Sequence, residues 1–240
     1  MPGIYEEVQF PRVASRDRDS RESMRPYVVL NMVQSADGKA AIGGKASGLG
    51  TDIDRGVMRT LRSRTDAVMV GGGTVRAERL SLSLDAEDTR AVPRAVILTN
   101  SGDLPLGKKL VRDSRQDVLV LLPEGAENGA EERLARPTET RRVSATESGE
   151  IDVGQALEIL KADYGVNVLL CEGGPTLNRA LMNDDLVDEL FLTIAPVLVG
   201  AQNTEGPRSP SQRPLRSLRL ISSQVAADEM FLRYAVERHS

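Results

Sequence analysis

Two glycine-rich stretches of the sequence each follow an apolar run and end in a threonine. The first, GGGT, occupies residues 71–74 after AVMV, and the second, GGPT, occupies residues 173–176 after VNVLLCE. Glycine carries no side chain, so its backbone N–H groups can approach an anion closely, and a following helix adds its positive end. The two stretches therefore predict two corners that hold one diphosphate between them. A pair of tight turns, in which glycine serves only the backbone conformation, is the alternative.

Two common nucleotide-binding patterns do not fit these residues. A dinucleotide fingerprint, G-x-G-x-x-G, that starts at Gly71 requires its third glycine where Arg76 stands. The stretch GKAAIGGKAS fails as a triphosphate loop, because Lys39 stands at the first glycine position and Ala46 replaces the required serine or threonine. The sequence therefore predicts neither a standard dinucleotide-binding fold nor a nucleotide triphosphatase.

The side chains that most often build metal and nucleophile sites are scarce. The only cysteine is Cys171, and the only histidine is His239, the second-last residue. A Cys/His zinc site and an internal disulfide are therefore excluded, and a Ser-His-Asp triad would have to use the end of the chain. We expect no metal site, and we expect the chemistry to use carboxylates, hydroxyls, lysine, arginine, backbone amides or a borrowed cofactor.

Composition narrows the partners and the compartment. The formal net charge is -4, and the aromatic residues are only four tyrosines and three phenylalanines, which argues against a nucleic-acid partner. No apolar window approaches about 18 residues, so we expect no membrane-spanning segment. A single cysteine and the lack of an apolar N-terminal signal suit the reducing cytoplasm. We therefore expect a cytoplasmic protein that acts on a small molecule.

Apolar patterning predicts an α/β domain. Near-continuous apolar runs predict buried strands, and amphipathic or capped segments predict helices between them. Strands are expected at 27–33, 67–70, 95–99, 118–122, 166–170, within 186–200 and as an antiparallel pair near the C-terminus, and helices at 51–64, 152–165 and 176–183. This alternation favours a mainly parallel sheet covered on both faces. Residues 1–25 are expected to form a flexible leader before a single domain over 26–240, with a polar loop or peripheral helix at 123–150.

Four segments together resemble one enzyme family. They are NMVQSADGKAA (31–41), LRSRTDAVMVGGGTV (61–75), VLLCEGGPTLNRAL (168–181) and LVDELFLTIAPVLVG (186–200). In this order they resemble the reductase of riboflavin biosynthesis, which forms the C-terminal half of the bifunctional bacterial deaminase/reductase and stands alone in archaea and fungi. No deaminase is expected in this chain, because the H-x-E and P-C-x-x-C signature is absent.

The resemblance implies a fold and an activity. The implied fold is dihydrofolate-reductase-like, with three α/β/α layers and a mainly parallel central sheet that ends in antiparallel C-terminal strands. The implied protein is a homodimer that uses NADPH to reduce a ribosylamino-pyrimidine 5′-phosphate, so that the ribosyl group becomes a ribityl chain.

The resemblance also assigns roles to matching positions. Asp37 and Lys39 are the candidates for proton handling beside the nicotinamide. The implied substrate-binding residues are Ser47 and Arg62 for the phosphate, Glu172 for the pyrimidine and Leu82 on the substrate side. The implied NADPH-binding residues are Val33, Leu49, Gly71, Gly72, Gly73, Thr74, Glu78, Gly173, Gly174, Pro175, Thr176 and Leu177. Candidates for holding a 2′-phosphate are Thr99, Asn100 and Ser101.

Other interpretations remain open at this point. Arg62 is also compatible with a solvated charge on a helix, Asp37 with the turn that an Asp-Gly pair favours, and Glu172 with a cap for the following helix. The stretch AERLSLSL carries Arg79 and Leu80 where the family commonly has Asp-Pro. The substrate is therefore left open between a riboflavin intermediate, deaminated or not, and dihydrofolate or another pterin. A non-catalytic nucleotide-binding paralogue is the alternative from another class.

Overall fold

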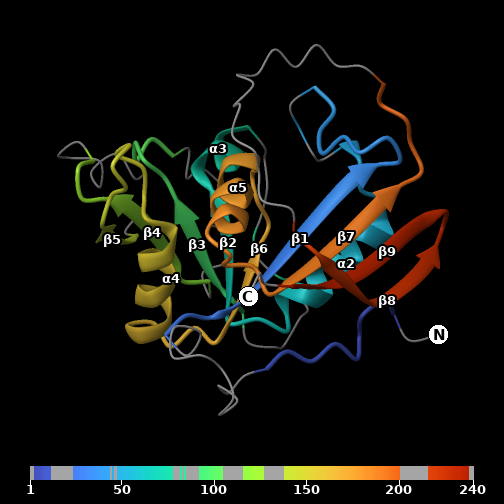
Figure 1. The fold of residues 1–240 in the computed structure, drawn as a ribbon, viewed down its shortest axis with the longest axis horizontal. Helices are drawn as coiled ribbons and strands as arrows, with labels where there is room; N and C mark the ends of the chain where they lie inside the picture. The colour runs from blue at the N-terminus through green and yellow to red at the C-terminus, as the bar shows by residue number, and fades with distance from the viewer. Residues whose placement is uncertain are drawn as a thin grey trace.

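One sheet organises the molecule. The computed structural model describes residues 3–11, 24–43, 45, 48–77, 82, 84, 92–104, 116–126, 138–200 and 216–237. Its strands are β1 (Tyr27–Ser35), β2 (Ala67–Gly71), β3 (Arg94–Leu98), β4 (Val118–Pro123), β5 (Glu139–Val143), β6 (Val168–Cys171), β7 (Glu189–Ala195), β8 (Leu218–Ala226) and β9 (Glu229–Val236). They lie in the order β5-β4-β3-β2-β6-β1-β7-β9-β8 (Figure 1). All neighbours from β5 to β7 are parallel, and β9 is antiparallel to both β7 and β8.

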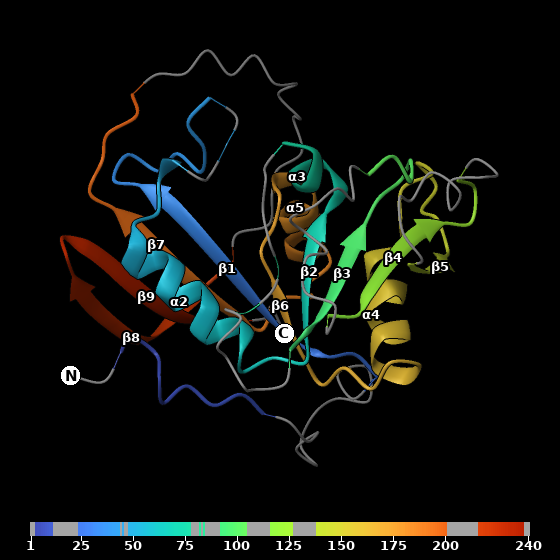
Figure 2. The same cartoon turned by 180° about the vertical axis from the view of Figure 1, so that it is seen from behind.

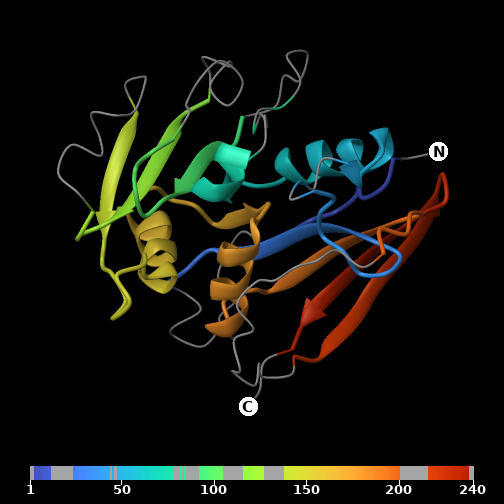
Figure 3. The ribbon, with the colours of Figure 1, turned by 90° about the horizontal axis from the view of Figure 1, so that it is seen from above.

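Helices cover both faces of this sheet, so the three-layer α/β/α prediction is confirmed. The helices are α2 (Asp52–Arg62), α3 (Gly72–Ala77), α4 (Val153–Ala162) and α5 (Pro175–Asn183). Helices α2 and α3 lie on one face, and α4 and α5 lie on the other (Figure 3). Each side has its own apolar core, one built around Val57, Leu61 and Val75 and the other around Leu157, Leu160 and Leu181. None of the helices in the described part of the chain is long and apolar enough to cross a bilayer.

Local sequence sets where the longer helices begin. The Thr51 side chain accepts hydrogen bonds from the N–H groups of Ile53 and Asp54 and thereby caps α2. Asp152 caps α4 by accepting from Gln155 N–H at 3.0 Å. Helix α5 begins at Pro175, whose fixed φ suits the first helical turn, after a glycine that offers no side-chain cap. These starts fix where the loops between strands and helices must run.

The chain order creates a switch point at the centre of the sheet. After β1 the chain builds β2, β3, β4 and β5 outward, and it then returns to insert β6 between β1 and β2. Ligands of open parallel sheets bind outside the carboxyl ends of strands at such a point. The carboxyl ends of β1, β2 and β6 therefore define where to search for a site.

The structure corrects three expectations about the chain. Residues 3–11, within the expected leader, belong to the folded domain, because Tyr5, Val8 and Phe10 are buried in the core that also holds Val57 and Leu61 of α2. Figure 2 shows the backbone of the N-terminal segment on the same side of the sheet as α2. Within 123–150, the residues Glu139–Val143 form the edge strand β5 instead of a loop or helix. The strand expected at 27–33 was predicted to be buried on both faces. This prediction is wrong beyond Leu30, because residues 31–34 are partly exposed.

Candidate active site

The two glycine-rich stretches are in direct contact. They follow β2 and β6, which are adjacent parallel strands, and the N–H of Gly71 donates to the carbonyl oxygen of Gly173 at 2.8 Å. A Cβ on Gly71 would lie 3.7 Å from the backbone nitrogen of Gly174. The two corners therefore form one continuous rim at the switch point.

The first stretch is a helix start instead of a turn. Gly71 ends β2, and Gly72 and Gly73 already belong to the six-residue helix α3. A Cβ on Gly72 would lie 2.9 Å from Thr99, so this glycine is required by packing. A Cβ on Gly73 would meet nothing within 4 Å, so no packing within the described residues requires a glycine there. At Gly73, therefore, the close approach of a ligand to the backbone is the better explanation for a glycine.

The second stretch brings its backbone against the first. A Cβ on Gly174 would meet Thr74 Oγ1 too closely unless that side chain moved, which favours glycine here. Gly173 has a φ of +90° and precedes a cis peptide bond to Gly174. Pro175 and Thr176 are exposed at the start of α5, whereas Leu177 is buried and anchors the helix to the sheet. The rim thus exposes a helix N-terminus and a threonine hydroxyl beside Gly73 and Thr74.

Arg62 and Glu172 are bonded to each other. The Nε of Arg62 donates to one Glu172 oxygen at 2.6 Å and its Nη2 donates to the other at 2.7 Å. The two side chains are only 4% and 9% exposed. A solvated position for Arg62 is therefore wrong, and so is a capping role for Glu172, because its carboxylate faces α2 and not the start of α5. The pair fixes the Glu172 carboxylate at the carboxyl end of β6.

Asp37 joins two loops beside β1. Its carboxylate accepts from Ser35 Oγ at 2.6 Å, from Val199 N–H at 3.1 Å and from Gly200 N–H at 2.9 Å. Gly38 completes the turn with a φ of +78°. These hydrogen bonds, the one from Ser35 above all, lower the pKa of Asp37 to about 2. An ionised carboxylate with these partners has no proton to donate near neutral pH, so Asp37 holds the turn that carries the exposed Lys39.

The end of β1 is open on the face that α2 covers. Val29 packs in the core beneath α2, so alternation places Asn31 and Val33 on the same face. Both are partly exposed although β1 is flanked by β6 and β7. Leu49, which the resemblance placed with Val33 beside the nicotinamide, is 4% exposed. The open end of β1 therefore lies between the Arg62–Glu172 pair and the loop at Asp37.

Some expected site residues lie elsewhere or outside the described residues. Leu82 is fully buried in the core, and its carbonyl accepts from the Gln116 side chain at 3.1 Å, so its side chain does not line an open site in this structure. Ser47 and Glu78 lie outside the described residues. Thr99 lies at the end of β3 beside Gly72, and its buried hydroxyl has no hydrogen-bond partner among the described residues.

Beside this site lies a pair of acids that sequence reasoning missed, the partly buried Asp54 and the fully buried Glu229. Asp54, in the first turn of α2, interacts with the Thr193 hydroxyl of β7 and with the charges of Glu172 and Glu229. Glu229 is 0% exposed and accepts hydrogen bonds from the backbone N–H and the hydroxyl of Thr51. The signal in the sequence is the pair Asp52 and Asp54 in the first turn of a helix. By itself this pair indicates only a favourable interaction of acidic side chains with the helix dipole. No group of residues within the described ranges is arranged as a metal site.

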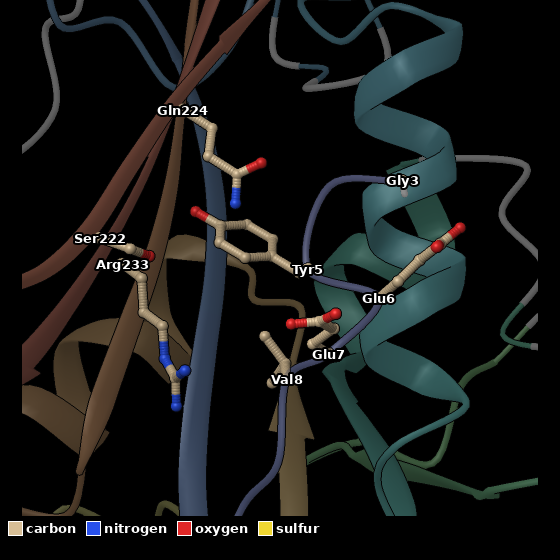
Figure 4. Close-up of a pocket in the computed structure, with 8 residues that line it drawn as sticks. All are labelled: Gly3, Tyr5, Glu6, Glu7, Val8, Ser222, Gln224 and Arg233. Carbon is tan, nitrogen blue, oxygen red and sulfur yellow. The ribbon is translucent and has the colours of Figure 1, made fainter. Parts of the chain in front are cut away.

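A separate hollow lies away from these residues. It has a volume of about 280 Å³ and is lined by the N-terminal segment and by β8 and β9. Figure 4 shows the Tyr5 hydroxyl directed toward Gln224, with Arg233 farther along the wall. Arg233 is bound to Glu189 at 2.7 and 2.9 Å. None of the expected site residues lines this hollow.

Comparison with known proteins identifies relatives that cover most of the chain. A curated 2,5-diamino-6-ribosylamino-4(3H)-pyrimidinone 5′-phosphate reductase of Methanothermobacter thermautotrophicus is 28% identical over 220 residues, which cover 89% of this chain and 100% of that protein. A pyrimidine reductase-like protein of Corynebacterium diphtheriae superposes with a TM-score of 0.70 at 21% identity, over 97% of this chain and 100% of that one.

A third comparison concerns a longer enzyme. The Thermotoga maritima diaminohydroxyphosphoribosylaminopyrimidine deaminase/5-amino-6-(5-phosphoribosylamino)uracil reductase has a TM-score of 0.67 at 22% identity, over 88% of this chain and 57% of that structure. The family profile of the RibD C-terminal domain matches residues 26–232. Because this match spans most of the chain, the protein belongs to the RibD C-terminal domain family.

Proposed function

We propose that this protein is an NADPH-dependent reductase of a ribosylamino-pyrimidine 5′-phosphate and that it converts the ribosyl group into a ribityl chain in riboflavin biosynthesis. The observation that carries the proposal is the contact between the two glycine-rich stretches at the switch point of the sheet. The name of the Methanothermobacter thermautotrophicus relative, which this chain covers completely, supports the same activity.

The rim suits a dinucleotide diphosphate. At Gly73 a ligand can approach the backbone of α3 without meeting a side chain, and at Thr176 the start of α5 is exposed. Helix N-termini and glycine backbones favour anions. The Thr99 hydroxyl, which has no hydrogen-bond partner among the residues that the structure describes, is with Asn100 and Ser101 the candidate for distinguishing NADPH from NADH. NADPH would supply the hydride, and the residues of this rim would hold its reactive ring beside the open end of β1.

Arg62 acts in this proposal through Glu172. Both nitrogens that face the carboxylate are engaged, so we assign Arg62 to fixing Glu172 toward the pyrimidine instead of holding the substrate phosphate. An arginine fork binds a carboxylate in one fixed plane, which orients the remaining lone pairs of Glu172.

Protonation falls to Lys39 or to water. Reduction of the open-chain sugar imine adds a hydride to the anomeric carbon and a proton to the adjacent nitrogen. Asp37 is ionised and engaged by two loops, so it is not the donor. Lys39 is exposed on the turn that Asp37 holds.

The same proposal places the protein in the cytoplasm, since its single cysteine suits a reducing compartment.

A spectrophotometric assay tests the proposed function. Purified protein is mixed with NADPH and, separately, with the 2-amino riboflavin intermediate, its deaminated 2-oxo form and dihydrofolate. We expect oxidation of NADPH with a ribosylamino-pyrimidine phosphate and formation of the ribityl product. Turnover of dihydrofolate alone would replace the proposed substrate class. Tight NADPH binding without oxidation in any mixture would indicate a non-catalytic protein and would contradict the proposal.

A further inference from the structure

Asp54 lies beside the proposed pyrimidine position. It occupies the first turn of α2, and the Thr193 hydroxyl of β7 interacts with its carboxylate. Thr193 is the register partner of Val33 on β1. Asp54 therefore stands above the open end of β1, on the same face of the sheet as Val33.

Asp54 is a second carboxylate, beside Glu172, that has surface left for a ligand. Glu229 is fully buried beneath Thr51, and each oxygen of Glu172 already accepts one hydrogen bond from Arg62. Asp54 is only partly buried, and a Cβ on Gly50 would collide with its Oδ2, so Gly50 leaves the space for that oxygen. A carboxylate in this position is not needed for the helix dipole, because the neighbouring Asp52 is 96% exposed in the same turn.

The surroundings of Asp54 make it an acceptor in need of donors. Burial raises the pKa of Asp54 most, and the negative charges of Glu229 on β9 and Glu172 on β6 raise it further. The Thr193 hydroxyl and Arg55 act in the opposite direction. Burying a carboxylate beside two others is unfavourable unless N–H or O–H donors meet it. Within the described part of the chain, the Thr193 hydroxyl is the hydrogen-bond donor to this carboxylate, and a ligand can supply further donors.

The two substrates named for relatives differ at one ring position. The compound in the name of the Methanothermobacter thermautotrophicus relative carries an amino group at C2 and a hydrogen on N3. The uracil in the Thermotoga maritima title carries an oxygen at C2. The 2-amino edge offers two parallel N–H donors, which match the two oxygens of a carboxylate. The 2-oxo edge places the C2 oxygen, an acceptor, against a carboxylate oxygen, which is also an acceptor. A carboxylate that loses a hydrogen bond in this way discriminates strongly against the 2-oxo compound.

We propose that the Asp54 carboxylate accepts hydrogen bonds from the 2-amino group and the adjacent ring N–H of the pyrimidine, and that it thereby selects the substrate that has not been deaminated. This inference rests on the proposed function. It identifies the residue that sets the substrate, where the comparisons identify only relatives that act on one or the other compound.

The test compares the two substrates in wild type and Asp54→Asn at pH 8. We expect the wild type to favour the 2-amino compound by about 100-fold or more in kcat/KM. An asparagine amide can offer its NH₂ group to a 2-oxo oxygen, so Asp54→Asn should reduce the preference to within about threefold or reverse it. Asp52→Asn, a change of the exposed acid two residues earlier, is the matched control and should keep the wild-type preference.

Two further readouts separate a recognition role from a structural one. Isothermal titration with each pyrimidine and no cofactor should give the same order of affinities as the kinetics. Affinity of the wild type for the 2-amino compound should fall as the pH falls through the pKa of Asp54, because only the ionised form accepts both hydrogen bonds. In Asp54→Asn this pH dependence should disappear, whereas NADPH affinity and the circular dichroism spectrum should not change.

The outcomes distinguish this inference from the proposed function. A wild type that reduces both compounds equally well, or an Asp54→Asn variant that keeps the full 2-amino preference, would overturn the role of Asp54 and leave the reductase assignment intact. A wild type that neither binds nor reduces either pyrimidine would overturn both.

Discussion

At the residue scale, the two adjacent glycines Gly72 and Gly73 have different expected roles, packing for Gly72 and ligand binding for Gly73. A Cβ on Gly73 would meet no atom of the described residues within 4 Å, and valine has a better helix propensity than glycine. We therefore expect Gly73→Val to fold with an unchanged melting temperature but to raise the NADPH Kd by about tenfold or more, a loss of ~1.4 kcal/mol.

The control for this pair is Gly72→Ala. Its Cβ would lie 2.9 Å from Thr99, so we expect a lower melting temperature from overpacking. Isothermal titration and thermal unfolding of both variants provide the measurements. Wild-type NADPH affinity in Gly73→Val would mean that no ligand approaches this backbone.

Also at the residue scale, the buried charges of Arg62 and Glu172 depend on each other for stability. Arg62→Ala leaves a buried carboxylate without its partner, and we expect a loss of about 3–5 kcal/mol in the free energy of unfolding. The double variant Arg62→Leu, Glu172→Leu should recover most of this stability but not the activity. Urea unfolding and the KM for the pyrimidine check both statements. If Arg62→Ala were as stable as wild type and only its KM rose, Arg62 would be acting on the substrate directly.

At the element scale, Asp37 ties the end of β1 to the segment that follows β7. Its pKa is lowered to about 2, so the folded state favours the ionised form. The stabilisation is therefore complete above the pKa of the unfolded chain, near 3.9, and is lost as the pH falls through about 2.

The direction of this pH dependence gives a test of the link between Asp37 and the segment that follows β7. We expect the melting temperature of Asp37→Asn to lie below that of the wild type by a constant amount between pH 5 and 8 and to converge with it as the pH approaches 2. Equal melting temperatures at neutral pH would show that the hydrogen bonds to Val199 and Gly200 contribute nothing.

Local patterns predicted the elements that have strong local signals. The apolar runs of β2, β3 and β4 and the capped helix α2 are where the sequence placed them, because burial on both faces and a Thr51 cap are visible in a few consecutive residues. Strand β5 was missed because its residues ETRRV lie at a half-exposed edge and carry the charges of a loop. Tyr5 and Phe10 were missed because they lie beside a polar stretch, and their burial depends on contacts with residues far along the chain such as Phe191.

The site could be predicted only in part for the same reason. The two glycine-rich stretches follow strands, and their meeting at one sheet edge follows from parallel topology. The pairing of Arg62 with Glu172 spans 110 residues and leaves no trace in either local pattern. Asp54 likewise depends on Thr193 and Glu229, which β7 and β9 bring to it.

At the scale of the whole molecule, one face of the sheet is suited to a second copy of the chain. On the face opposite α2, strands β8 and β9 expose Leu220, Val225 and Met230. Helices α4 and α5 lie over the other half of that face (Figure 3). Exposed apolar patches of this kind mark association surfaces.

We therefore propose a homodimer through this face. Light scattering should give twice the chain mass for the wild type and a single chain mass for the double variant Leu220→Glu, Val225→Glu. Gln224→Glu, which changes an exposed residue on the other face of β8, should remain dimeric. A monomeric wild type at micromolar concentration would contradict the proposed dimer.

The most direct measurement is a crystal structure of the protein with NADPH. We expect the diphosphate at the rim between α3 and α5, within hydrogen-bond distance of backbone nitrogens at Gly73 or Thr74 and at Thr176 or Leu177. We expect the nicotinamide over the end of β1. A dinucleotide bound elsewhere, for example in the hollow beside Tyr5 and Arg233, would contradict it.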